Sequence, residues 1–211
     1  NIQAGSDGIS FITESSSGTV KLSANNNIIN AGGDGIYLTE GTTGTVELEA
    51  KNGNNEITAD KNHGIGVNSS SVTLKAENGE NIIHSNNPYN KWDSGIYVVN
   101  QGSQVTLTAQ QNKIYAGQYG IISGSNKTGG IVALTATVGD NIISSKEVGI
   151  RSAYNGQVTL TAQQNNRIRS TSAVDYAVYV NSAQVELDAV NNIIEAGDNL
   201  ESSLYGNSYA L

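Results

Sequence analysis

The chain has 211 residues and a formal net charge of −8, with 11 basic side chains, 19 acidic side chains and no cysteine. The absence of cysteine excludes a disulfide framework and a thiolate metal site. The basic residues are scattered, whereas nucleic-acid binding needs a concentrated positive surface, so no nucleic-acid partner is expected. No apolar run approaches the length of a transmembrane helix, and no direct insertion of this chain into a membrane is expected.

One sequence frame recurs seven times along the chain. It begins with Val-x-Leu-x-Ala, continues through a short polar gap to Asn-x-Ile, and closes on a more variable block, Gly-Ile-x-apolar. The frames begin at Val20, Val46, Val72, Val105, Val132, Val158 and Val185. Successive frames are 26 or 27 residues apart, except for a spacing of 33 between Val72 and Val105. A period of this length is the signature of a repeat architecture.

Each block of the frame alternates apolar and polar residues, as a strand with one buried face does. The blocks are too short for helices, and Gly, Asn, Ser and Asp fill the gaps between them, as turns require. Three short strands cannot bury their apolar faces alone, but stacking unit on unit buries them. We therefore predict an all-β fold, a single-stranded parallel β-helix (solenoid) of about eight rungs, each of roughly 27 residues and three short strands. We expect a right-handed coil, because parallel crossovers are overwhelmingly right-handed.

The repeat predicts one β-helix domain over residues 1–211. Residues 2–5 align with residues 29–32, so the chain begins inside a rung, and we expect it to be a fragment of a longer array. Residues 84–94 break the period and contain the only proline and the only tryptophan. An insertion in a solenoid maps to a loop, so residues 84–94 are predicted to protrude from the rod.

An asparagine precedes the isoleucine of the second block in every frame. Asparagine tolerates left-handed backbone and bonds neighbouring main chain. Stacked at one corner, these side chains are expected to form a ladder of amide hydrogen bonds between rungs. The members of this column are Asn27, Asn55, Asn81, Asn112, Asn141, Asn166 and Asn192.

Two glutamates are the strongest candidates for catalytic chemistry. Glu47 and Glu49 lie on the outward face of one strand, roughly 7 Å apart, a separation that could suit a pair of catalytic carboxylates. However, Lys21 lies one rung from Glu47, and Lys75 lies one rung from Glu49. We interpret the four residues as cross-rung charge pairs, and we predict neither a catalytic site nor a cofactor.

The two histidines, His63 and His84, fall in gaps between predicted strands and lack the spacing of metal ligands. We expect them to be solvated, and we predict no metal site.

Aromatic residues are scarce, so their placement is informative. Tyr97 occupies an outward position of a third-block strand and follows the loop that carries Tyr89 and Trp92. Exposed Tyr and Trp side chains that lie near one another commonly serve recognition. We predict that Tyr89, Trp92 and Tyr97 contact a ligand. The alternative is that Trp92 holds the loop against the rod.

The units V-x-L-x-A, N-x-I and G-I-x-V, rich in Asn, Gly, Thr and Ser and without a catalytic cluster, resemble the passenger domains of Gram-negative autotransporter adhesins and related secreted haemagglutinin-like proteins. The resemblance covers nearly the whole chain but lies in repeat style, so it carries over no binding residue. It implies an extracellular position on the bacterial cell surface. It also implies adhesion, through a surface glycan or protein receptor or through self-association. The alternatives are a polysaccharide-cleaving β-helix enzyme, a phage tailspike-like fibre, and a purely structural stalk.

Overall fold

The computed structural model describes residues 1–12, 17–87, 92–124, 128–172, 176–197 and 204–206, the last three through their backbone only. Within these ranges the chain forms 23 β-strands and no helix. No helix that is long and apolar enough to cross a membrane is therefore present in the described ranges.

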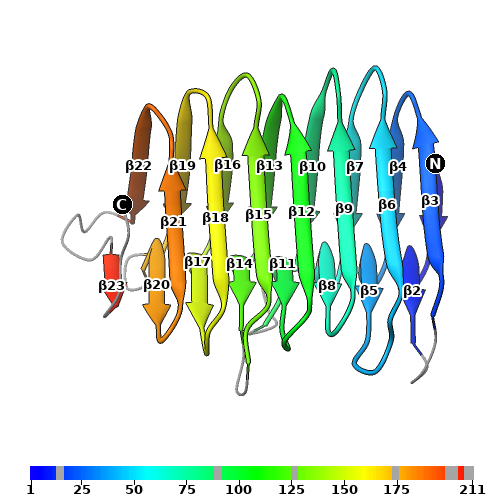
Figure 1. Ribbon diagram of the computed structural model, residues 1–211, viewed down its shortest axis with the longest axis horizontal. Helices are drawn as coiled ribbons and strands as arrows, with labels where there is room; N and C mark the ends of the chain where they lie inside the picture. Colours follow the sequence, from blue (N-terminus) through cyan, green and yellow to red (C-terminus); the bar gives the residue numbers. More distant parts are fainter. Residues whose placement is uncertain (13–16, 88–91, 125–127, 173–175, 198–203, 207–211) are drawn as a thin grey trace.

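The strands form three parallel sheets, which run along the length of the molecule (Figure 1). Sheet A contains β1 (Ile2–Ala4), β4 (Asn27–Ala31), β7 (Asn55–Ala59), β10 (Glu80–Ser85), β13 (Gln111–Ala116), β16 (Asn141–Ser145), β19 (Asn165–Ser170) and β22 (Asn191–Ala196). Sheet B contains β2 (Ile9–Phe11), β5 (Ile36–Leu38), β8 (Ile65–Val67), β11 (Ser94–Val98), β14 (Tyr119–Ser123), β17 (Val148–Ala153), β20 (Val178–Asn181) and β23 (Leu204–Gly206). Sheet C contains β3 (Thr19–Ala24), β6 (Thr45–Ala50), β9 (Ser71–Ala76), β12 (Gln104–Ala109), β15 (Ile131–Ala136), β18 (Gln157–Ala162) and β21 (Gln184–Asp188).

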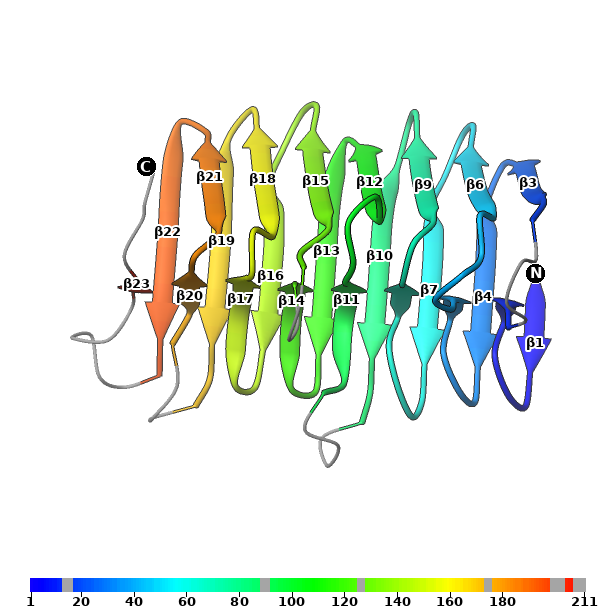
Figure 2. The same cartoon turned by 60° about the horizontal axis from the view of Figure 1, so that its bottom comes forward.

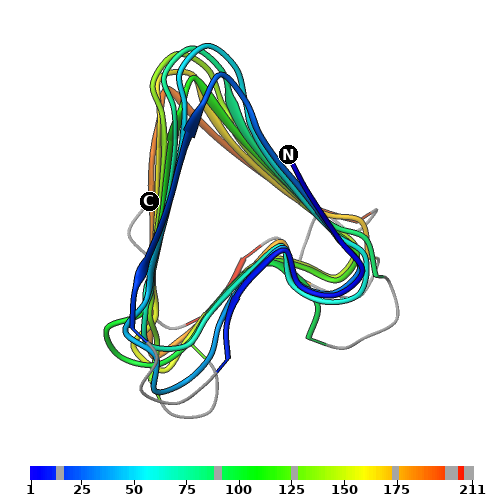
Figure 3. The same cartoon turned by 90° about the vertical axis from the view of Figure 1, so that its right-hand side faces the viewer.

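The chain visits the sheets in the order A, B, C, so the prediction of a parallel β-helix with three strands per rung is confirmed. Counted over the described residues, seven complete turns, the first being β1 to β3, precede the two strands β22 and β23. Figure 2 shows the strands of sheet A side by side in sequence order. Viewed from the N-terminal end, the chain runs clockwise as it recedes, which makes the coil right-handed (Figure 3).

The repeat sets the register between turns. In sheet C, Val105 pairs with Val72 on one side and with Val132 on the other. Leu107 pairs with the leucines of the same two neighbouring strands. Each column of identical apolar residues therefore runs along the interior, and nearly all its members are fully buried. Because each turn covers the next, a narrow column of Val, Leu and Ile is enough to form a core.

The asparagine column forms the expected ladder at the corner between sheets C and A. Each side-chain amide donates to the Oδ1 atom of the next asparagine, at 2.8 to 3.0 Å, from Asn27 through to Asn192. All six bonds point in the same direction along the rod, an arrangement in which each bond polarises the next. Asn112 and its two neighbours in the ladder are completely buried, so these bonds satisfy amides that would otherwise be costly to bury.

A column of glycines lies at the start of sheet B, where the cross-section bends inward (Figure 3). A Cβ atom on any of them would lie only 2.2 to 2.5 Å from the Cγ2 atom of an isoleucine in sheet A. The column comprises Gly8, Gly35, Gly64, Gly95, Gly120 and Gly149. Glycine is needed here because the backbone of sheet B approaches the core too closely for any side chain. The outer face of sheet B is therefore the concave side of the molecule.

The segment that connects the two strands is shorter than the insertion predicted over residues 84–94. His84 and Ser85 still belong to β10, and Ser94 begins β11, so residues 86–93 connect the two strands. At the C-terminal end, where the sequence offered no clear register, the backbone of Leu204 pairs with that of Val178.

Candidate functional site

The outer face of sheet C carries the two glutamates that the sequence offered as catalytic candidates. Glu47 forms an ion pair with Lys21 at 2.9 Å. Glu49 lies 3.8 Å from Lys75 and accepts a hydrogen bond from Ser23. The predicted cross-rung charge pairs are confirmed. Each carboxylate faces a lysine of an adjacent turn, although Lys75 lies closer to Glu77, at 2.6 Å, and such exposed pairs contribute little to stability.

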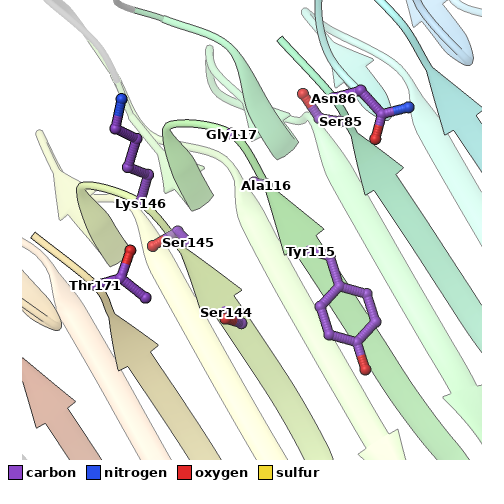
Figure 4. Close-up of a pocket in the computed structure, with 9 residues that line it drawn as sticks. All are labelled: Ser85, Asn86, Tyr115, Ala116, Gly117, Ser144, Ser145, Lys146 and Thr171. Atoms are coloured by element: carbon purple, nitrogen blue, oxygen red, sulfur yellow. The ribbon is translucent and has the colours of Figure 1, made fainter. Parts of the chain in front are cut away.

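Two hollows lie at the corners of the coil, and in neither do reactive side chains converge on one position. One, of about 330 Å³, lies at the ends of the sheet A strands and is lined by residues that include Tyr115, Ser145 and Lys146 (Figure 4). Figure 4 shows that Tyr115 and Lys146 extend in different directions, and that no group of side chains meets at one point. The other, of about 360 Å³, is lined by residues of three corner segments, among them Gln101, Thr128 and Asn155. The described residues contain no group of three His, Cys, Asp or Glu side chains that could hold a metal ion.

The outer face of sheet B is different, because it gathers most of the aromatic side chains that the structure describes. One column of paired positions contains Ser10, Tyr37, Gly66, Tyr97, Ile122, Arg151 and Tyr179. The residues that directly precede the glycine column contribute His63 and Tyr119, and Tyr176 holds the same position in the seventh turn, before Ala177. We name as the ring strip Tyr37, His63, Trp92, Tyr97, Tyr119, Ile122, Arg151, Tyr176 and Tyr179.

The first part of the ring strip spans the second to the fourth turn. His63 and Tyr97 stack face to face, with ring centroids 4.5 Å apart and an angle of 3° between the ring planes. Gly66 leaves room for Tyr37, because a Cβ atom at Gly66 would lie 2.7 Å from the Tyr37 ring and 3.2 Å from His63. The phenolic oxygen of Tyr37 accepts a hydrogen bond from Asn68.

His63 is held in this stack and is only partly exposed, so the prediction of a solvated loop histidine was wrong. Its Nδ1 atom lies 3.0 Å from the hydroxyl of the buried Ser94, and its backbone N–H donates to Asp34. Burial lowers the pKa of His63 to about 4, because a charged imidazolium would lose its hydration there. The same packing raises the pKa of Asp34, whose carboxylate is also buried.

The second part of the ring strip spans the fourth to the seventh turn and is organised by Trp92. Trp92 belongs to the fourth turn but reaches forward: its ring stacks on Tyr119 of the fifth turn, with centroids 6.4 Å apart. The guanidinium carbon of Arg151, in the sixth turn, lies 5.7 Å from the Trp92 ring and 5.8 Å from the Tyr179 ring. Tyr179 in turn contacts Tyr176 at 6.1 Å.

Ile122 joins the two parts of the ring strip. It pairs with Tyr97 on one side and with Arg151 on the other, and it is completely buried although it lies on the outer side of the sheet. The strip therefore continues from the second to the seventh turn. Five steps at the usual interstrand distance give it a length on the order of 24 Å.

The predicted site residues have three different outcomes. Tyr89 lies outside the described residues. Trp92 and Tyr97 lie on the same outer face, but each stacks on a different partner, Tyr119 and His63 respectively. Trp92 packs against the neighbouring turns, as the second alternative expects, and keeps 46% of its surface exposed.

Sequence reasoning missed Tyr119, Tyr176 and Arg151. The signal was present in the repeat alignment, because Arg151 occupies the same position as Tyr97, and Tyr119 the same position as His63. Reading those two positions down all the frames would have brought together every member of the ring strip except Trp92.

The ring strip offers a ligand a defined set of groups. Stacked rings cover one face of each other, so a ligand meets mainly ring edges, phenolic hydroxyls and the partly exposed Trp92. Such a surface is amphipathic: the rings supply contact area, and the hydroxyls supply hydrogen bonds. None of the family models, curated proteins or solved structures with which the chain was compared matches it.

Proposed function

We propose that this chain is an adhesive segment of a bacterial cell-surface protein, a rod that binds an extended saccharide chain along the ring strip. The observation that carries the proposal is the concentration of stacked rings on one concave sheet in a chain whose aromatic content is only 6%. These rings are not needed to build the coil, because the interior columns of Val, Leu and Ile already fill the core.

The ring strip suits a linear, polar ligand. Its side chains repeat at the spacing of the turns, about 4.8 Å, which is close to the length of one sugar unit in an extended polysaccharide. Phenolic hydroxyls can exchange hydrogen bonds with sugar hydroxyls, and Trp92 offers an aromatic surface for the apolar face of a sugar ring. A long, shallow contact of this kind supports adhesion, since many weak contacts along a rod add up.

Binding accounts for the described surface better than catalysis does. The two candidate carboxylates on sheet C face lysines of adjacent turns, and they lie on a different sheet from the ring strip. On the ring strip side, the Asp34 carboxylate accepts hydrogen bonds from the backbone of His63 and from Asn62. These hydrogen bonds give the Asp34 carboxylate a structural role at the corner of the coil. A position on the cell surface is part of the proposal and follows the resemblance in repeat style.

The first test is binding to a glycan array that carries neutral and acidic polysaccharides, with three single-alanine variants. Trp92→Ala and Tyr97→Ala should each weaken binding about tenfold or more, as the loss of an aromatic hot spot does. Tyr115→Ala is the matched control, because Tyr115 also stacks on a histidine of the preceding turn, His84, but on the outer face of sheet A.

Three results would contradict the proposal. The parent chain could bind no polysaccharide, which would favour a structural stalk. The three variants could lose affinity equally, which would move the contact surface away from sheet B. The parent could instead release oligosaccharides from a bound polymer, which would revive the enzyme alternative.

A further inference from the structure

One cation on the ring strip lacks the partner that the other arginines have. Arg167 pairs with Asp140 at 2.9 Å, and Arg169 lies 3.9 Å from Glu195. Arg151 forms no ion pair with any residue in the described ranges. Its Nη1 atom is shielded from solvent and, within the same ranges, has no hydrogen-bond partner. A guanidinium that is partly withdrawn from water without a counter-charge is costly.

The surroundings of Arg151 hold its charge in a fixed place. Trp92 and Tyr179 lie within 6 Å of the guanidinium carbon, which is cation–π distance. The three lysines that form no ion pair in the described ranges are exposed: Lys51, Lys61 and Lys146. Among the described cations, Arg151 is therefore the one that is both half-buried and unpaired. A planar guanidinium restrained by rings is well suited to bind an oxyanion with two parallel hydrogen bonds.

We infer that the ligand of the ring strip is an acidic saccharide, a sugar chain whose carboxylate or sulfate group is bound by Arg151 beside Trp92 and Tyr179. The inference rests on the proposed function and adds the chemical class of the ligand. It also adds the position of the ligand along the rod. The anionic group of the saccharide must lie over the sixth turn, where Arg151 is, and its uncharged sugar units lie over the earlier turns. The net charge of −8 repels a polyanion at long range, so the attraction has to come from this local contact.

Pairs of polymers that differ only in a charged group isolate the contribution of that charge to binding. Polygalacturonate and its fully methyl-esterified form share the same ring and linkage and differ in the carboxylate. Dextran sulfate and dextran provide the corresponding pair for sulfate. The dissociation constants of all four polymers would be measured with the 211-residue chain by calorimetry or biolayer interferometry. We expect at least one acidic polymer to bind about tenfold or more tightly than its neutral partner, as a charge-assisted bidentate contact provides.

Two variants with the same change in net charge, and a third that keeps the charge, complete the experiment. Arg151→Gln should abolish the preference for the acidic polymer over its neutral partner, because the charged donor pair is lost. Arg169→Gln, in sheet A and already facing Glu195, should keep the preference. Arg151→Lys should keep only part of it, because an ammonium ion lacks the planar pair of donors. Thermal unfolding of each variant checks that the fold is retained.

The outcomes distinguish this inference from the proposed function. If the parent binds acidic and neutral polymers equally and Arg151→Gln changes neither, the acidic-ligand inference is wrong, whereas the ring strip remains a saccharide site. If Arg169→Gln reduces the preference as much as Arg151→Gln does, the preference for the acidic polymer comes from net charge, and the assignment of the anion-binding group to Arg151 is wrong. If none of the four polymers binds, the inference is overturned, and the glycan array then decides the proposed function by itself.

Discussion

Replacing Asn112 with alanine is expected to lower the free energy of unfolding by about 3 to 5 kcal/mol, because it breaks two buried hydrogen bonds, leaves the Oδ1 atom of Asn141 without its donor and adds a small cavity. Asn112 accepts a hydrogen bond from Asn81 and donates one to Asn141, each at 2.9 Å. All three side chains are completely buried, so water cannot replace the lost bonds. The change is measured by denaturant unfolding followed by circular dichroism.

Asn52→Ala is the matched control for this ladder prediction. Asn52 makes the same kind of bond to an asparagine of the preceding turn, Asn25, at 3.2 Å, but on the exposed surface. Its removal should change the free energy of unfolding by no more than about 0.5 kcal/mol, as surface substitutions usually do. Equal losses for the two variants would show that the buried ladder contributes nothing beyond an exposed amide pair.

Acidification is expected to remove about 3 kcal/mol of stability through His63 alone. The folded-state pKa of His63 is lowered to about 4, from an ordinary value of 6.5. Between these two values the unfolded chain binds the proton and the folded chain does not, so stability falls as the pH decreases from about 6.5 to about 4. Above that window both states are neutral at this residue, and below it the loss is complete. Each pKa unit corresponds to about 1.4 kcal/mol.

The pH dependence is assigned by comparing the parent with His63→Gln. Carboxylates are also protonated on acidification, among them Asp34, whose pKa is raised by burial. They are present in both proteins, so the difference between the two stability curves isolates the imidazole. Above pH 7 the difference in unfolding free energy should no longer depend on pH. The constant difference that remains there comes from the lost stack on Tyr97. The loss of stability should persist in His84→Gln, which retains His63. A parallel pair of curves for the parent and His63→Gln would contradict the assignment.

The architecture was predictable because the repeat determines which side chains fill the interior of a solenoid. The valine and leucine positions represented by Val105 and Leu107 recur in every frame, and stacking alone explains why these residues pair with their counterparts in adjacent turns. The asparagine ladder was predictable for the same reason, since a buried amide at every turn needs an identical neighbour. Lys21 and Glu47 could be paired because strand register fixes which outward side chains are adjacent.

The candidate site was only partly predictable, because it combines repeat positions with one side chain that departs from the repeat. Tyr97 was correctly placed on the outer face, since its position follows from the period of a strand. The stack of Tyr97 on His63 was missed, because His63 lies in a gap where no strand was predicted. The contact of Trp92 with Arg151, two turns further along, depends on the path of the insertion, and a repeat pattern contains no information about that path.

The position of the ligand on the ring strip can be read directly from the fluorescence of Trp92. This is the only tryptophan in the chain, and 46% of its surface is exposed. Titration with a polysaccharide that binds the parent should shift the emission to shorter wavelength and reduce quenching by acrylamide, with the same dissociation constant as the binding itself. Saturable binding that leaves both the emission and the quenching of Trp92 unchanged would contradict the account and place the ligand elsewhere on the rod.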